Sequence, residues 1–146
     1  MDEKLKQAFH SRVEREPFAK KFGLKLAEIG LGYSRVEMKF TPDMENMFGI
    51  AHGGAIFALI DEAFETASNS HGTWAVALNM NITFIAPAQP GGTLVAEARE
   101  ISRTRKTATY EIKVRDEGNE LIASCQALVY RKGTPLPDME EPTRQD

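Results

Sequence analysis

The chain has 146 residues, 42% hydrophobic and 27% charged, which is ordinary for one globular domain with its own core. Its 18 basic and 21 acidic residues give a net charge of -3, which excludes an overall electrostatic footprint for nucleic acid. The single cysteine, Cys125, excludes an intramolecular disulfide, and the charged N-terminus has no apolar run typical of a signal peptide or membrane span, so we expect a cytoplasmic protein.

Two helices are predicted at the N-terminus. Residues 2–16 place apolar side chains four positions apart, namely Leu5, Phe9 and Val13. With charged residues between them, this spacing is typical of an amphipathic surface helix. Pro17 suits the first turn of a second, short helix that ends near Gly23. We therefore treat residues 1–21 as an N-terminal helical segment.

After these helices, apolar side chains recur at every second residue. Leu24 and Leu26 alternate with charged or small neighbours, and residues 34–40 alternate apolar and charged side chains. Each stretch predicts a strand with one wet face. The glycines between them, Gly30 and Gly32, suit a hairpin turn.

Residues 46–67, NMFGIAHGGAIFALIDEAFETA, are the most unusual part of the sequence. A short loop leads through His52 and Gly53 into a helix that is apolar on nearly all sides, which predicts burial at the centre of the fold. We expect Asp61 to be the one carboxylate within the apolar part of this helix. A buried carboxylate is costly unless it is partnered or used, so Asp61 is the first candidate for a catalytic group.

Three or four strands follow, joined by short turns. In residues 74–84 the large apolar side chains occupy even positions, so we expect the even face to be core and the odd face, with Asn79 and Asn81, to be small and polar. Further strands are predicted at residues 94–102, 108–115 and 121–130. The tail from Thr134 is rich in proline and acids, and we expect it to be disordered.

Strands joined by short turns predict a largely antiparallel sheet, and a helix that is apolar nearly all round needs a surface that curls about it. We therefore expect an α+β fold in which an antiparallel sheet wraps around one long central helix. The expected organisation is the helical segment 1–21, one main domain over 22–133 and the tail 134–146.

Residues 46–61 resemble the signature of a known family. The run N-x-x-G-x-x-H-G-G at residues 46–54, followed by Asp61 within LIDEAF, is similar to the signature of hotdog-fold acyl-CoA thioesterases of the PaaI type. The likeness spans roughly residues 22–132 and includes MNITFIAPA. It implies a hotdog fold and hydrolysis of acyl- or aryl-CoA thioesters to free acid and CoA, with no metal or cofactor. It also implies a homodimer whose sheets join edge to edge, commonly paired again as a homotetramer.

The resemblance also implies catalytic roles. Asp61 would be the general base or the nucleophile, while the Gly53 amide and the Asn46 side chain would polarise the thioester carbonyl. His52 would orient the substrate or assist the leaving sulfur. A helix N-terminus suits a developing oxyanion because it presents unpaired amides at the positive end of the helix dipole. Water activation by Asp61 and direct attack on the carbonyl both stay open.

The substrate-binding candidates are Gly54, Asn79, Asn81, Arg103, Arg105 and Lys106. The basic stretch 103–106 is the candidate for the phosphates of CoA, because arginine can bind phosphate through two parallel hydrogen bonds. Each candidate also has a structural interpretation, as a solvated turn, a sheet surface or a subunit contact. His10 and His71 have no metal-ligand spacing, so no metal site is expected.

Helix geometry separates two of the catalytic candidates. Eight residues of helix place Gly53 and Asp61 about 12 Å apart, at about 1.5 Å per residue. One reacting carbon cannot lie about 3 Å from both groups. If both are catalytic, they belong to different subunits, and a two-fold axis that lays two such helices antiparallel gives two composite sites per dimer.

A second class of function stays open, in which a non-catalytic hotdog protein binds acyl-CoA as a sensor or an assembly module. No DNA-binding segment accompanies the domain, and a pure assembly module has no need of Asp61 in an apolar helix. The expected partner is a small acyl-CoA, with neither nucleic acid nor membrane.

Overall fold

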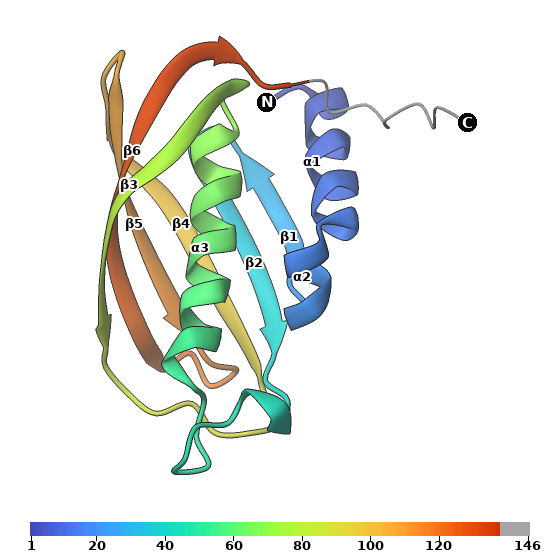
Figure 1. Ribbon diagram of the computed structural model, residues 1–146, viewed down its shortest axis with the longest axis vertical. Helices are drawn as coiled ribbons and strands as arrows, with labels where there is room; N and C mark the ends of the chain where they lie inside the picture. Colours follow the sequence, from blue (N-terminus) through green and yellow to red (C-terminus); the bar gives the residue numbers. More distant parts are fainter. Residues whose placement is uncertain (138–146) are drawn as a thin grey trace.

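The computed structural model describes residues 1–137 (Figure 1). Its helices are α1 (Glu3–Arg15), α2 (Pro17–Phe22), the short 3-10 turn η1 (Pro42–Met44) and α3 (Gly53–Asn69). Its strands are β1 (Lys25–Gly30), β2 (Tyr33–Lys39), β3 (Thr73–Phe84), β4 (Thr93–Arg103), β5 (Thr107–Arg115) and β6 (Leu121–Pro135). None of the helices in this described part is long and apolar enough to cross a bilayer.

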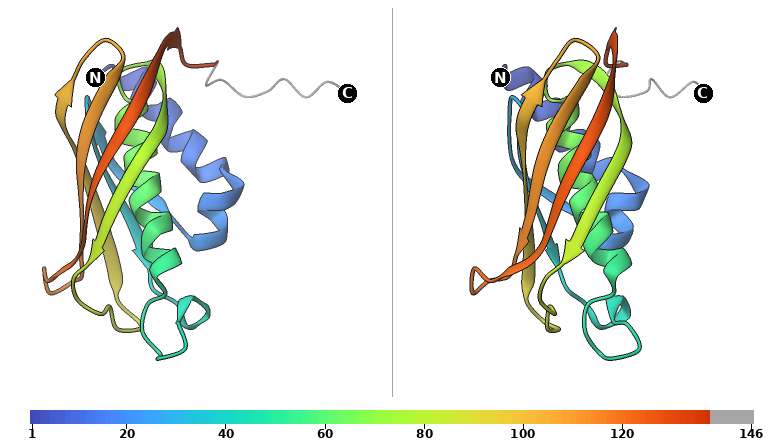
Figure 2. Two further views of the ribbon diagram at one scale, coloured as in Figure 1. Left: turned by 60° about the vertical axis from the view of Figure 1, so that its left-hand side comes forward. Right: turned by 90° about the vertical axis from the view of Figure 1, so that its left-hand side faces the viewer.

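The six strands form one sheet in the order β1-β2-β4-β5-β6-β3, and every neighbouring pair is antiparallel. The sheet curves around α3, as Figures 1 and 2 show. This arrangement confirms the expected fold, an antiparallel sheet wrapped around one long helix. The two edges of the sheet are β1 and β3, and each of these strands pairs with one neighbour only.

The N-terminal helices lie beside α3, next to β1 (Figure 1). Asp2 caps α1 by accepting a hydrogen bond from the Lys4 N–H. The apolar stripe of α1 and the start of α2 bury Phe9, Val13 and Ala19 in the main core. The predicted helical segment 1–21 therefore shares one core with the sheet, because its apolar stripe has no other surface to cover it.

Helix α3 is buried along most of its circumference. Twelve of its 17 residues are buried, and they face the sheet or the N-terminal helices. The remaining side forms a stripe at helical spacing, made of the exposed Gly54, Phe57 and Glu65 and the half-buried Asp61. This stripe is the one side of α3 that residues 1–137 leave open.

The expected alternation of β3 is wrong in its first half. A register shift between Ala77 and Asn79 leaves Leu78 outside the ladder as a β-bulge, which reverses the phase of the strand. Ala77 and Met80 therefore face inward, opposite the buried Val129 and Ala127 of β6. Trp74 and Leu78, expected in the core, are 40% and 57% exposed.

The last strand is longer than predicted. β6 continues to Pro135, so the tail expected from Thr134 begins with two residues of strand. The N–H of Leu136 then donates a hydrogen bond to the carbonyl of Gly72 at 3.1 Å. The rest of the predicted tail, from residue 138, lies outside the described residues.

Candidate active site

His52 caps the N-terminus of α3. Its Nδ1 accepts a hydrogen bond from the Gly54 N–H at 2.9 Å. Because Nδ1 is an acceptor, the neutral ring carries its proton on Nε2, and the ring is exposed. His52 is thus a helix cap whose Nε2–H has no acceptor among the described residues, a role that the sequence analysis did not foresee.

The Gly53 N–H is left unpaired at this helix end. The other three amides of the first turn are occupied: Gly54 donates to the His52 ring, and Ala55 and Ile56 donate to the His52 carbonyl. For Gly53 no acceptor exists within residues 1–137. An unpaired amide at a helix N-terminus is a ready hydrogen-bond donor for a developing negative charge.

Phe84, at the end of β3, lies directly over Gly53. A Cβ atom on Gly53 would lie 3.3 Å from Cζ of the Phe84 ring, closer than ordinary van der Waals contact. Glycine therefore permits this close approach. Sequence reasoning placed Phe84 only on a strand face, although its position in MNITFIAPA, part of the resemblance, was a signal.

Asn46 organises the loop before α3. Its Oδ1 accepts hydrogen bonds from the N–H groups of Phe48 at 2.8 Å and Ile50 at 3.3 Å. Gly49, with φ +75°, completes the turn by donating to the Asn46 carbonyl. Since Oδ1 is used by the loop, Nδ2 remains as a donor. Asn46, Gly53 and Phe84 line the same open cleft of about 520 Å³.

Asp61 opens into a second cavity, of about 380 Å³, which is also lined by Trp74 and Ala77 of β3. Burial raises the pKa of the Asp61 carboxyl above its ordinary value. We expected Asp61 to be the only acid in the apolar part of the helix, and this expectation is wrong. Glu62 is only 3% exposed, and Glu65 lines the same cavity. The sequence analysis did not consider Glu62, whose burial depends on the packing of the N-terminal helices against α3.

The candidate catalytic residues thus fall into two groups within one chain. Asn46 and Gly53 share the cleft at the N-terminus of α3, with the exposed His52 beside them. Asp61 lies about two turns further along the helix in a different cavity. A single chain therefore does not bring the carboxylate and the amide donors together.

The basic stretch lies at the other end of the molecule from Asn46. Arg103, Arg105 and Lys106 form the β4–β5 turn, which Figure 1 shows at the top, opposite the loop that leads into α3. Arg103 Nε donates to Glu100 Oε1 at 3.2 Å, so this guanidinium is partly occupied. Arg131 of β6 joins the patch by donating to the Thr104 carbonyl at 2.8 Å. Sequence reasoning left Arg131 out because only the β5–β6 register brings it there.

The other substrate-binding candidates are spread over the chain. Gly54 is exposed, but its N–H is taken by the His52 cap. Asn79 and Asn81 are exposed on the outer face of β3, opposite Leu128 and Gln126, and hydrogen-bond to each other. Their side chains point away from α3, because Met80, which lies between them in the strand, packs against the core.

The comparisons with known proteins agree with this fold. Residues 48–123 match the model of the thioesterase superfamily. The chain is 42% identical over 113 residues to a putative esterase of Archaeoglobus fulgidus, covering 77% of this chain and 73% of the relative. It is 32% identical over 133 residues to the acyl-coenzyme A thioesterase PaaI of Escherichia coli, covering 91% of this chain and 95% of PaaI.

Solved structures give the same result. The structure of E. coli PaaI superposes with a TM-score of 0.86, covering 90% of this chain and 96% of PaaI. A Streptococcus mutans protein whose structure was solved bound to acetyl CoA superposes with a TM-score of 0.74 at 25% identity, covering 77% of this chain and 90% of its own. With its hotdog fold and a PaaI relative matched over nearly its full length, this chain belongs to the thioesterase superfamily.

Proposed function

We propose that this protein hydrolyses acyl- or aryl-CoA thioesters at sites that two copies of the chain complete together. The observation that carries the proposal is that one helix holds both an unpaired N–H, that of Gly53, and a carboxylate, Asp61, that burial makes more basic. The Gly53 N–H would polarise the thioester carbonyl, and Asp61 would act as the base or the nucleophile. The thioesterase activity of the PaaI relative supports the same reaction.

The carbonyl oxygen of the thioester would accept hydrogen bonds from the Gly53 N–H and from Asn46 Nδ2. Both residues line one cleft, and neither donor has an acceptor within residues 1–137. As the tetrahedral intermediate forms, negative charge develops on that oxygen and these bonds strengthen. The Nε2–H of His52 lies at the rim, where it can orient the substrate or assist the leaving sulfur.

Asp61 would supply the second half of the reaction. As a general base it takes a proton from water, the hydroxide adds to the carbonyl carbon, and the C–S bond breaks to release the CoA thiolate. As a nucleophile it adds to the carbonyl itself, and water then hydrolyses the resulting anhydride. Both routes use the same ionised carboxylate and give the same products.

The dimer required by this site would form along β3. This strand is a 12-residue sheet edge with exposed apolar side chains, which is a template for pairing with another strand. Beside it, the open stripe of α3 exposes Phe57 together with Asp61. Antiparallel pairing of two β3 edges would lay two α3 helices antiparallel and bring Gly53 of one chain towards Asp61 of the other. A homotetramer would join two such dimers.

The CoA moiety would bind at the basic β4–β5 turn. Arg105 and Lys106 are exposed there, and Arg131 adds a third positive charge. Arginine and lysine side chains in such an arrangement bind phosphate groups well. The S. mutans relative, which was solved with acetyl CoA, supports a nucleotide-thioester ligand for the fold.

The test is release of free thiol from a panel of acyl- and aryl-CoA esters, comparing the wild-type protein with Asp61→Asn. We expect turnover by the wild type and a loss of about 100-fold or more in Asp61→Asn, because a positioned base contributes about that much. Glu120→Gln, at an exposed turn, is the control for a lost surface acid. Binding of the esters without thiol release would favour the non-catalytic binding function instead.

A further inference from the structure

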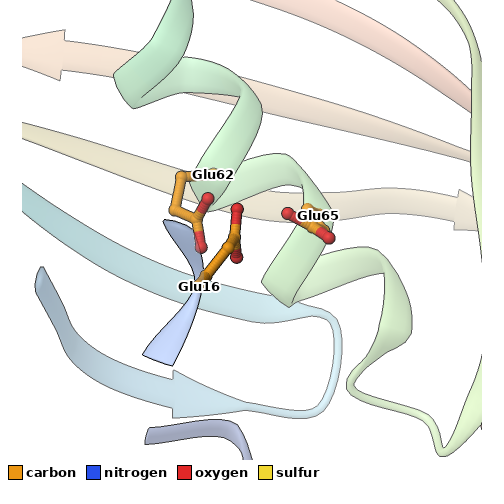
Figure 3. Close-up of side chains that lie close together, drawn as sticks. All are labelled: Glu16, Glu62 and Glu65. Carbon is orange, nitrogen blue, oxygen red and sulfur yellow. The ribbon is translucent and has the colours of Figure 1, made fainter. Parts of the chain in front are cut away.

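Three glutamates meet where the N-terminal helices touch α3. Glu16 is the residue between α1 and α2, while Glu62 and Glu65 are three positions apart on one face of α3. One carboxylate oxygen from each lies within 4.8 Å of the other two. Figure 3 shows the Glu16 carboxylate between those of Glu62 and Glu65.

The most buried of these acids, Glu62, hydrogen-bonds to the Glu16 side chain, but one of its two oxygens has no partner within residues 1–137. Glu62 is 3% exposed, and its Oε1 has no hydrogen-bond donor within residues 1–137. Burial raises the pKa of Glu16 and of Glu65, and the positive charge of Arg12 partly offsets the rise, whereas no cation among residues 1–137 offsets it for Glu62. Burial, the negative charges of Glu65 and Glu16, the hydrogen bond to Glu16 and the negative charge of Asp61 together raise the pKa of Glu62 to about 9. A buried carboxyl in these surroundings needs a proton or a cation.

We propose that Glu16, Glu62 and Glu65 form a binding site for a hard divalent cation of the size of Ca²⁺, which ties the α1–α2 junction to α3. Carboxylate oxygens are the ligands that such cations prefer. The buried carboxylate of Glu62 supplies the innermost ligand. The half-buried Glu16 and the exposed Glu65 complete the site from two different elements.

Oxygens that lie within 4.8 Å of one another fit the bond lengths of calcium without any rearrangement. Two oxygens bound to one Ca²⁺ ion can be separated by up to about 5 Å, since each bond is about 2.3–2.6 Å long. For Mg²⁺, with bonds of about 2.0–2.1 Å, the limit is about 4.2 Å. Separations of up to 4.8 Å are therefore within the reach of Ca²⁺ as the side chains stand. Water molecules would fill the remaining coordination positions.

An ion can reach this site from solvent. All three glutamates line the 380 Å³ cavity that also contains Asp61, and Glu65 is at its exposed side. The cation would compete with the proton that Glu62 otherwise holds, and with the positive charge of Arg12 across the cavity. The binding itself needs no second chain and no substrate, so it stands or falls separately from thioester hydrolysis.

The experiment is calorimetric titration of the full chain with CaCl₂ and with MgCl₂ near neutral pH, after treatment with a chelator. We expect one Ca²⁺ per chain, weaker binding of Mg²⁺, and a Ca²⁺-dependent rise in Tm. In Glu62→Gln and Glu16→Gln the affinity for Ca²⁺ should fall by more than about tenfold, because ligand charge sets the affinity of such sites. Glu14→Gln, an exposed acid two residues from Glu16, should bind as the wild type does.

Two results would overturn the proposal. One is the absence of both heat and Tm shift with CaCl₂ up to about 10 mM, above the weakest range of protein calcium sites. The other is equal Ca²⁺ affinity in the wild type and in both folded variants, Glu62→Gln and Glu16→Gln. Circular dichroism establishes that each variant is folded. Either result would leave a shared proton as the occupant of the cluster.

Discussion

Gly53 and Asp61 belong to the same helix, but they line different cavities of the chain. Eight residues of helix hold them about 12 Å apart, and no side-chain movement can change that spacing. A site that uses both groups must therefore combine two chains. The first prediction tests this requirement directly.

Mixing an Asp61→Ala chain with an Asn46→Ala chain should restore activity that neither variant has alone. Each mixed dimer contains one site with an intact Asn46 and an intact Asp61, and one site with neither. Random exchange makes about half of the dimers mixed, so about a quarter of the wild-type thiol release should return. Absence of recovery, with subunit exchange verified by native mass spectrometry, would refute composite sites.

The pH dependence of kcat/KM should reflect the ionisation of the Asp61 carboxyl. The carboxylate must be ionised to act as base or nucleophile, and burial raises its pKa. Activity should therefore fall on acidification, with an acid limb that lies above the usual Asp value of about 3.9. Tm measured over the same pH range separates titration from acid unfolding. A flat profile down to about pH 4 would contradict this assignment.

Two substitutions at His52 should separate capping from chemistry. His52→Ala removes the acceptor for the Gly54 N–H and should lower the free energy of unfolding by about 1 kcal/mol. His52→Asn keeps a good cap but lacks the Nε2–H, so its Tm should stay near that of the wild type. We expect both variants to lose about tenfold or more in kcat/KM. If His52→Asn instead keeps the wild-type kcat/KM, His52 acts only as a helix cap.

Removal of the basic turn should weaken CoA binding selectively. Arg105→Ala combined with Lys106→Ala should raise KM for a CoA thioester by about three- to tenfold, as expected for two exposed charge contacts. A pantetheine thioester, which lacks the nucleotide phosphates, should be nearly unaffected. Lys25→Ala, an exposed lysine on β1, is the control. Arg103 is left intact in this test because it holds Glu100. An equal rise in KM for the two thioesters would show that this turn does not bind the phosphates of CoA.

The buried Glu62 should make stability depend on pH in the absence of divalent cations. Its pKa is raised from 4.5 to about 9 by burial and by neighbouring carboxylates, so folding favours the protonated form. That contribution is complete below about pH 4.5 and is lost as pH rises towards about 9. Glu62→Gln mimics the protonated form and should exceed the wild type in Tm by a few degrees near pH 8. The difference should shrink towards about pH 5, and a pH-independent difference would contradict the assignment.

Much of the fold follows from local pattern. The period of two in residues 34–40 and 108–115 predicted β2 and β5, and the apolar circumference of residues 53–67 predicted that α3 lies inside a curled sheet. These predictions succeed because period and burial are coupled within each element. The distance between Gly53 and Asp61 is likewise fixed by the rise of a helix, before any tertiary contact forms.

Other features depend on register between distant strands and helices. The bulge at Leu78 reverses the faces of β3, and only the pairing with β6 reveals it. Arg131 meets the β4–β5 turn, and Glu16 meets Glu62, across long stretches of chain. The sequence alone determined which residues could carry out the chemistry and how far apart one helix holds them. Tertiary structure decided which donors stay unpaired and which acids meet, because packing between elements is set by the whole core rather than by neighbours in the chain.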